Sequence, residues 1–430
     1  MSATGAAVVR GGTVVDATGR RRADVLVVDG RVAAVGTGLD VPTATTVLDA
    51  SGCVVAPGLV DLHAHLREPG FEESETVETA SRAAALGGYC AVVAMPNTEP
   101  AVDSAAVVRH VQQLGERALC QVAVAGAITV GRAGRQLAPM AELAEAGVRL
   151  FTDDGAGVQD ALLMRRALEY GRGLGVTLAQ HCEDAALAGG ASMHEGEWSS
   201  RLGIPGAPAE AEELMVMRDL ALARLTGARL HLLHLSTAGS VELVARAKAA
   251  GVPVTAEAAP HHLVLTHAEV ASYDPVFKVN PPLRTAADVA ALRAGLAGGT
   301  IDAVATDHAP HPQEAKELPF DQAPPGMLGL QTCLAVCLTE LDLPVERTLA
   351  LLSWQPAAIA GLADQHGGPV APGAPANLCV IDPAATWVVD PATLASRSTN
   401  TPWRGRTLTA RVRHTLFRGE PVVVDGRATR

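Results

Sequence analysis

Hydrophobic residues near both ends of the chain follow the pattern of short strands. Over residues 1–56, Val-rich runs such as DVLVVDG and TTVLDASGCVV alternate with turn-forming residues and show no helical period. Asp29 and Gly30 stand between two such runs, and Asp-Gly accepts the positive φ angles of a tight hairpin turn. The same character returns over residues 365–430, in NLCVIDPAATWVVD and RVRHTLFRGEPVVVDGR. We therefore predict one small β-sandwich domain made of residues 1–56 and 365–430.

Between residues 57 and 364 the pattern changes to short apolar runs that alternate with Ala- and Leu-rich amphipathic stretches of helical character. The strand candidates are GLVDLHAHL, CAVVAMPNT, QVAVAGAIT, VRLFTDDG, VTLAQHCED, LHLLHLST, VTAEAAPHHL and IDAVATDHAPH. Eight strands mostly separated by helices predict an α/β fold with a parallel (β/α)₈, TIM-like barrel over 57–364. The turn-rich stretch 310–328 is expected to form a loop over the barrel mouth.

Charge and composition narrow the functional class. Of the 430 residues, 48% are hydrophobic, so the chain can bury a large core. The formal net charge of −12 argues against a nucleic-acid partner, which would need a basic face to offset the phosphates. A small anionic substrate stays possible, because a few Arg and His residues can reverse the local field inside a cleft.

The cysteine pattern and the N-terminal sequence favour a reducing, cytoplasmic compartment. The seven cysteines show no CxxC spacing, and several lie within apolar runs, which favours a reducing environment over a disulfide framework. The N-terminus has no basic start followed by an apolar run, and no charge-free stretch is long enough to span a membrane. We expect a cytoplasmic protein without a membrane partner.

Histidines and aspartates at the ends of the predicted strands form a candidate metal centre. His63 and His65 are two positions apart on one strand, so both side chains project from the same face. One HxH pair is weak evidence, because an isolated histidine is more often a core residue with a satisfied hydrogen bond. Four other strand ends add the candidates Asp154, His181, His234 and Asp307. Together the six residues predict a site for two metal ions.

One aspartate of this centre has an adjacent aspartate that could replace it, and the other is a candidate base. Asp153 and Asp154 are neighbours in FTDDG, and neighbours on a strand point to opposite faces, so only one should reach the metals. Two metal ions can share a hydroxide that is nucleophilic near neutral pH, and they polarise the carbonyl it attacks. Asp307 is our candidate general base, which takes the proton and returns it to the departing amide nitrogen.

Three further residues suggest what the site binds. Arg67 follows the HxH pair, Asn97 ends the second strand in MPNT, and His311 follows Asp307 on the closing loop. An arginine with amide and imidazole donors forms a receptor for a carboxylate, although an isolated Arg67 would more often be exposed on a loop. Asn280 in KVNPPLR is a possible further contact. The remaining histidines have no place in this set, and five of them are expected to be exposed: His110, His194, His267, His366 and His414.

These motifs together resemble the amidohydrolase superfamily and, within it, the type I dihydroorotases of bacteria. The resemblance runs over nearly the whole chain, through PGLVDLHAHLREPG, MPNT, FTDDG, AQHCED, APHHL, KVNPPLR, ATDHAPH and SRSTNTPWRG. It implies two zinc ions per subunit and the reversible hydrolysis of (S)-dihydroorotate to N-carbamoyl-L-aspartate in pyrimidine (UMP) biosynthesis. It also implies a homodimer or an assembly with aspartate carbamoyltransferase.

The resemblance also assigns roles to the candidate residues, and its spacing favours Asp154 over Asp153 as the bridging ligand. The implied metal ligands are His63 and His65 for the first ion, Asp154 as the bridge, His181 and His234 for the second ion, and Asp307 as ligand and general base. The implied substrate contacts are His65, Arg67, Asn97, Asn280 and His311, with the backbone at Pro325 and Gly326. Relatives commonly have Phe where this chain has Pro325.

Two alternative functions share part of this pattern. Hydantoinases, dihydropyrimidinases and allantoinases resemble the chain, but a carboxylated lysine on their fourth strand typically bridges the metals. The only lysines here are Lys248, Lys278 and Lys316, all well beyond that strand, so a carboxylate from FTDDG must bridge. A non-catalytic, dihydroorotase-like scaffold subunit of aspartate carbamoyltransferase would usually lack metal ligands, and none is missing here.

Overall fold

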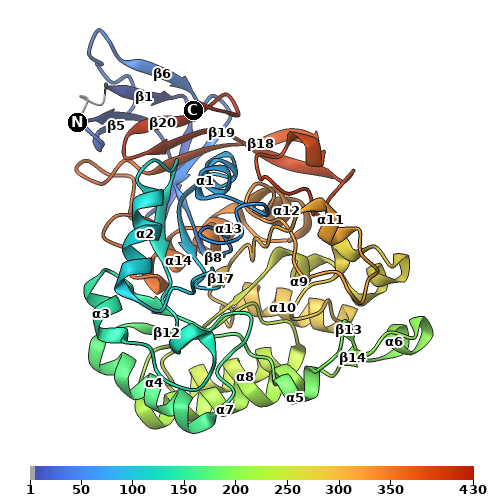
Figure 1. Ribbon diagram of the computed structural model, residues 1–430. Coiled ribbons are helices and arrows are strands. Elements are labelled where there is room, and N and C mark those ends of the chain that lie inside the picture. The colour runs from blue at the N-terminus through green and yellow to red at the C-terminus, as the bar shows by residue number, and fades with distance from the viewer. Residues whose placement is uncertain (1–4) are drawn as a thin grey trace.

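Eight parallel strands lie at the centre of the structure, a computed structural model that describes residues 5–430 (Figure 1). They are β8 (Leu59–Ala64), β9 (Tyr89–Ala94), β10 (Gln121–Val124), β11 (Leu150–Phe151), β12 (Thr177–Gln180), β15 (Leu230–Leu232), β16 (Val254–Ala258) and β17 (Ala303–Val304). One sheet has the order β10-β9-β8 and another the order β11-β12-β15-β16-β17. Parallel bridges between Gly126 and Phe151 and between Ala64 and His308 connect the two sheets at both edges. The pairing therefore returns to its starting strand, and the α/β class is confirmed.

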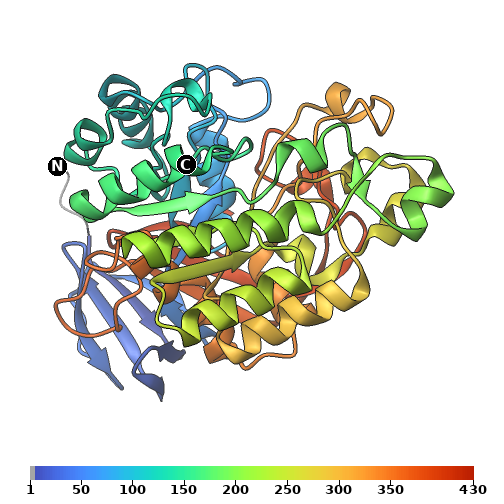
Figure 2. The same cartoon turned by 90° about the horizontal axis from the view of Figure 1, so that it is seen from below.

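Helices alternate with these strands and cover them on the outside. They include α1 (Val77–Leu86), α2 (Ala105–Gly115), α3 (Met140–Glu145), α4 (Ala161–Leu174), α7 (Glu210–Thr226), α8 (Ala238–Ala249), α10 (Ala286–Gly298), α12 (Cys333–Glu340), α13 (Val345–Leu352) and α14 (Trp354–Ile359). Figure 2 shows α4, α7, α8 and α10 side by side, and each packs on the next. Polar side chains that accept a backbone N–H bond begin several of them: Thr76, Ser104, Asp160, Thr237 and Thr285.

Shorter elements fill the connections. They are α5 (Ala185–Ala188), β13 (Met193–His194), α6 (Glu197–Leu202), β14 (Gly206–Ala207), α9 (Pro260–Val264) and α11 (Gln313–Lys316), with the 3₁₀ turns Val130–Arg132, His267–Ser272, Pro275–Phe277 and Pro391–Thr393. The expected loop over 310–328 is present and contains α11 as its one short helix.

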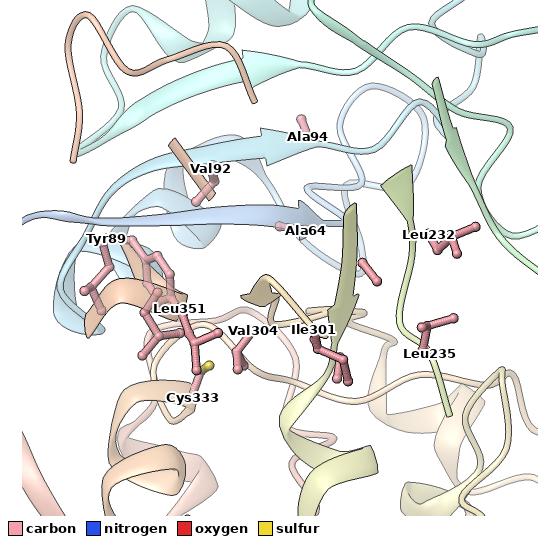
Figure 3. Close-up of a cluster of buried hydrophobic side chains, with 14 of the residues drawn as sticks. Ala64, Tyr89, Val92, Ala94, Leu232, Leu235, Ile301, Val304, Cys333 and Leu351 are labelled. Carbon is pink, nitrogen blue, oxygen red and sulfur yellow. The ribbon is translucent and has the colours of Figure 1, made fainter. Parts of the chain in front are cut away.

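The core between strands and helices consists mainly of aliphatic side chains. Figure 3 shows Tyr89 of β9 and Val304 of β17 packed with Cys333 of α12 and Leu351 of α13. All four are buried. All seven cysteines are buried, and none forms a disulfide within the described residues. In the same part of the chain, no helix is both long enough and apolar enough to cross a membrane.

The two ends of the chain form two further sheets, which lie together in Figure 1, and only the second sheet combines strands from both ends. The first has the order β5-β4-β1-β6 and the second β21-β20-β19-β18-β7-β2-β3. Their strands are β1 (Ala7–Arg10), β2 (Thr13–Asp16), β3 (Gly19–Arg22), β4 (Asp24–Val28), β5 (Arg31–Gly36), β6 (Thr46–Asp49), β7 (Val54–Pro57), β18 (Leu378–Val388), β19 (Thr407–Phe417), β20 (Glu420–Val424) and β21 (Arg427–Ala428). One hydrophobic cluster joins residues of both sheets, including Val9, Val25, Val14 and Val380. The predicted Asp29-Gly30 turn joins β4 to β5, with φ angles of 50° and 76°.

Gly58 joins the terminal sheets to the central strands. It follows β7 and precedes β8, and its carbonyl accepts a bond of 2.9 Å from Ser353 Oγ. A Cβ at this position would lie 2.2 Å from Cys90 Sγ. The close approach leaves room only for glycine, and it fixes where β8 begins.

Asp16 links residues from the two ends of the chain. Its carboxylate accepts bonds of 2.8 Å from Arg21 Nη2 and 2.9 Å from the Val370 amide. Thr18 donates to it from both its amide and its hydroxyl. Burial would raise the pKa of Asp16, but the hydrogen bonds from Arg21 and Thr18 lower it to about 2.

Replacing Asp16 with Asn tests this link. Asn keeps the shape but loses the charge, so we expect the free energy of unfolding at pH 7 to fall by about 1–3 kcal/mol. The folded-state pKa lies below the ordinary value of 3.8, so the charge stabilises the fold above that pH and the stabilisation is lost as the pH falls toward about 2. Thermal unfolding followed by circular dichroism should show the difference from wild type shrinking with pH. The exposed Asp49→Asn variant is the control, and equal losses in both variants would contradict the role of Asp16.

Candidate metal centre

The six predicted metal ligands lie together at the carboxyl ends of the central strands. His63 lies in β8 and His65 directly follows it, whereas the other four come from the segments after β11, β12, β15 and β17. Those four are Asp154, His181, His234 and Asp307. All six are at least 94% buried, so the structure brings together every ligand that the sequence suggested.

Asp154 is at the centre of the cluster. Its Oδ1 lies 3.4 Å from His63 Nε2, 3.6 Å from His181 Nδ1 and 3.5 Å from His234 Nε2. Its Oδ2 lies 3.7 Å from His65 Nε2. Burial would raise the pKa of Asp154, but the neighbouring His63, His181 and His234 hold it well below its ordinary value. The carboxylate therefore stays charged and faces imidazoles from three different strands.

Asp307 contacts two histidines of the same cluster, His65 and His63. Its Oδ1 lies 3.3 Å from His65 Nε2 and 3.6 Å from His63 Nε2. Its Oδ2 lies 3.6 Å from Nε2 of His261. Although burial acts against the charge, a hydrogen bond from His65 and the nearby His63 lower the pKa of this carboxyl. Asp307 is thus an ionised carboxylate beside the other candidate ligands.

The cluster fits a divalent metal. Two triplets have ligand atoms within 4.8 Å of one another, namely His63, His65 and Asp307, and His63, Asp154 and His234. Among the described residues, His63 Nε2 and Asp154 Oδ1 are buried without a hydrogen-bond partner. Buried polar atoms without a partner are costly, and imidazole nitrogens with carboxylate oxygens form a ligand set suited to zinc and related ions. A bound cation would satisfy both atoms.

The structure separates the two adjacent aspartates. Asp153 turns away from the histidines and accepts bonds of 2.8 Å from the Ile128 amide and 3.0 Å from the Thr129 amide, with a further bond from the Thr129 hydroxyl. It therefore fixes the loop after β10, and Asp154 alone faces the cluster.

Glu257 is a functional candidate that sequence reasoning missed. It lies in β16, fully buried, and bonds to His63 Nδ1 and His231 Nε2 at 3.0 Å each. Burial would raise the pKa of Glu257, but the bonds from His231 and His63 lower it to about 2. Because a carboxylate only accepts, the Nδ1 of His63 carries a proton, which leaves Nε2 as the nitrogen that faces the cluster. A glutamate in the otherwise uncharged strand VTAEA was the signal available in the sequence.

Asp61 orients the segment that carries Asp307. It is fully buried in β8 and accepts bonds of 2.8 Å from the Thr306 amide and 2.6 Å from the Thr306 hydroxyl. Burial raises its pKa to about 7 despite these bonds. Asp61 is absent from the predicted site, although it lies two positions before His63.

A pocket of about 210 Å³ opens onto the cluster. All seven predicted substrate contacts line it: His65, Arg67, Asn97, Asn280, His311, Pro325 and Gly326. His65 Nδ1 lies 3.0 Å from Asn97 Oδ1, and Arg67 Nη2 lies 3.4 Å from His311 Nε2. Burial lowers the pKa of Arg67 to about 10, which leaves the guanidinium charged at neutral pH. The pocket thus combines a cation and neutral donors with the candidate metal centre.

Several other histidines were predicted wrongly. His194, His366 and His414 were expected to be exposed but are at least 92% buried. Each has a partner that satisfies it: Arg284 Nη1 for His194, Gln121 Oε1 for His366 and the Asp49 carbonyl for His414. Of the other two, His110 is exposed and His267 is partly buried. His261, which had no place in the predicted ligand set, lies against Asp307.

Known proteins resemble the chain over nearly its full length. The family model described as Dihydro-orotase-like matches residues 52–240. The dihydroorotase of Mycobacterium tuberculosis is 52% identical over 418 residues, which cover 94% of this chain and 96% of that protein. The dihydroorotase of Pelotomaculum thermopropionicum is 48% identical, covering 97% and 98%. Among solved structures, an L-hydantoinase (dihydropyrimidinase) from Arthrobacter aurescens has a TM-score of 0.88 at 27% identity, covering 99% of this chain and 97% of that one.

Replacing Glu257 with Gln tests whether this carboxylate supports metal binding. Gln keeps the volume but removes the charge that orients His63, so we expect metal affinity to fall by about 10–100-fold. The measurement is metal content after dialysis against graded chelator concentrations. Asp16→Asn is the control, because it also removes a buried carboxylate but lies in the terminal sheets. Equal metal retention in wild type and Glu257→Gln would rule out the role.

Proposed function

The chain belongs to the dihydroorotase family and is an enzyme of that family, and on this premise we propose how its residues act on (S)-dihydroorotate. The reaction is the reversible hydrolysis of this cyclic amide to N-carbamoyl-L-aspartate in pyrimidine (UMP) biosynthesis. One observation supports the proposal most directly: the pocket of about 210 Å³ joins Asp154 and Asp307 to Arg67 and His311. A base, a candidate metal centre and a carboxylate receptor thus meet in one space.

Two zinc ions per subunit fit the ligand set. His63, His65 and Asp307 would hold the first, His181 and His234 the second, and the Asp154 carboxylate would contact both. When bound, the ions lower the pKa of the attacking water and polarise the ring carbonyl. Glu257 would hold the His63 ring through Nδ1 and so leave Nε2 available to bind a metal ion.

Asp307 is the proposed general base and acid. Its ionised carboxylate takes the proton of the attacking water as the C–O bond forms. When the ring C–N bond breaks, the same group returns the proton to the amide nitrogen, so the proton balance closes within one turnover. His261 contacts the second oxygen of Asp307 and lies on the side away from His65.

Arg67, Asn97 and His311 are the proposed receptor for the substrate carboxylate. A guanidinium matches a carboxylate with paired N–H bonds, and its partly buried position strengthens the attraction. Asn280 and the backbone at Pro325 and Gly326 line the same pocket and would contact the ring. The same receptor argues against hydantoins and dihydropyrimidines as preferred substrates, since those rings have no matching carboxylate.

The proposal extends to the domain architecture, the cellular compartment and the assembly of the protein. The closed order of strand pairs supports a (β/α)₈ barrel over 57–364, and the shared hydrophobic cluster supports a sandwich of residues 1–56 and 365–430. The unpaired cysteines are compatible with a cytoplasmic location.

A homodimer, with or without aspartate carbamoyltransferase, is the assembly we propose. The full set of metal ligands argues against a silent scaffold.

The Asp307→Asn variant tests the proposed base. We expect the kcat for dihydroorotate hydrolysis to fall by about 10²–10⁴-fold, because proton transfer loses its acceptor. Asp302→Asn is the control, since Asp302 lies just before the amino end of β17 and pairs with Lys248. Absorbance assays and metal analysis of both proteins are required. Asp307→Asn protein that retains metal and turns over like the control would exclude Asp307 as the base.

The Arg67→Met variant tests the carboxylate receptor. Its kcat/KM for dihydroorotate should fall by about 10²-fold or more, because the substrate carboxylate loses its charged partner. The rate with 5,6-dihydrouracil, the same ring without the carboxylate, should change far less. Arg166→Met, which removes an exposed arginine of α4, is the control. Parallel losses on both substrates would mean that Arg67 supports the site without recognising the carboxylate.

A further inference from the structure

Lys316 connects the loops that form the outer wall of the catalytic pocket. It is the last residue of α11, and its Nζ donates to three backbone carbonyls. The acceptors are Pro324 O at 2.8 Å, Pro275 O at 2.9 Å and Lys278 O at 3.5 Å. An ammonium group has three N–H donors, so these contacts use all of them.

The carbonyls belong to two loops that carry proposed substrate contacts. Pro324 directly precedes Pro325 and Gly326, and Lys278 lies two residues before Asn280. All three of these contact residues line the pocket. Lys316 therefore bonds to the backbone next to the groups that would contact the ring, while its own side chain does not line that pocket.

A second set of bonds ties the same wall together. The Gly326 amide donates to Lys278 O at 2.8 Å, so this carbonyl has two donors. His311 Nε2 bonds to Pro325 O at 2.8 Å. Asn400 Nδ2 donates to Gly326 O at 3.1 Å, and Asn400 Oδ1 accepts from the His311 amide at 3.2 Å. The position of the 324–326 backbone thus depends on three side-chain donors, from Lys316, His311 and Asn400.

The wall also separates two spaces. His311 lines both the catalytic pocket and an adjoining outer cavity of about 690 Å³, and Lys316 lines the outer cavity. If the loops move outward, the catalytic pocket opens into the larger cavity and its contacts with the substrate lengthen. A small displacement of positioning groups is enough to weaken binding markedly.

We propose that Lys316 is a positioning residue for substrate binding, which holds the 275–280 and 324–326 loops at the distance that the substrate ring requires. The proposal rests on the proposed function, because it names these loops as substrate contacts. Loops that bind the ring in the ground state and in the transition state alike affect KM and leave kcat unchanged. Removing the ammonium should therefore separate the two constants.

The test compares Lys316→Met with Lys248→Met. Lys248 is also partly buried, and its Nζ lies 2.6 and 2.7 Å from the Asp302 carboxylate near the amino ends of the strands. In metal-loaded enzyme we expect the KM for dihydroorotate to rise about tenfold in Lys316→Met, with kcat within about twofold of wild type. The Lys248→Met enzyme should keep the wild-type KM. Lys316→Arg, which retains several N–H donors, should restore most of the affinity.

Hydrogen exchange provides a readout that does not depend on turnover. In the substrate-free protein, the Gly326 amide and the 275–280 segment should exchange faster in Lys316→Met than in Lys248→Met. Unchanged exchange and an unchanged KM in Lys316→Met would overturn the proposal, as would equal effects of the two variants. If wild-type enzyme does not turn over dihydroorotate, the proposed function fails, whereas the exchange comparison still decides whether Lys316 holds the loops.

Discussion

The carboxylate of Asp154 lies among imidazoles from three strands, with almost no contact with water. Burying so many ionisable groups is unfavourable unless each has a partner of opposite charge or a metal ion. Neighbouring residues provide part of this compensation. Glu257 satisfies His63 from behind, and Asp61 bonds to Thr306 next to Asp307. The fold therefore stabilises a site whose last partner is supplied from outside the chain.

Periodicity in the sequence predicted most of the centre because parallel strands place their carboxyl ends together. Each of the eight strand candidates coincides with a strand of the structure, and their polar ends supply all six candidate ligands. The observed strands are shorter than the apolar runs, with only two residues each in β11 and β17. The runs continue into segments that carry the ligands, where the chain leaves the sheet. His234 and Asp307 have positive φ angles at these points, a bend that hydrophobic patterning does not reveal.

What the sequence could not predict depends on contacts between distant segments. Asp154 was preferred to Asp153 on family spacing, whereas the structural reason is that the Ile128 and Thr129 amides bind Asp153. The sequence predicts Glu257 only as part of a strand. Its partners His63 and His231 come from other strands, and only the folded chain brings them into contact with it. His194, His366 and His414 lie in polar stretches, and only the folded chain gives each a buried hydrogen-bond partner.

The seven-stranded sheet combines strands from both ends of the chain, and this affects the order in which the protein folds during translation. Pro57 in β7 pairs with Leu378 in β18, and the whole central region lies between them in the chain. On the ribosome, the edge of β7 emerges long before its partner, and at about 5–20 residues per second the wait is on the order of tens of seconds. During translation that edge is an unpaired template for other chains. The central strands can pair within this time, so they would come together before the sheet that joins the two ends of the chain.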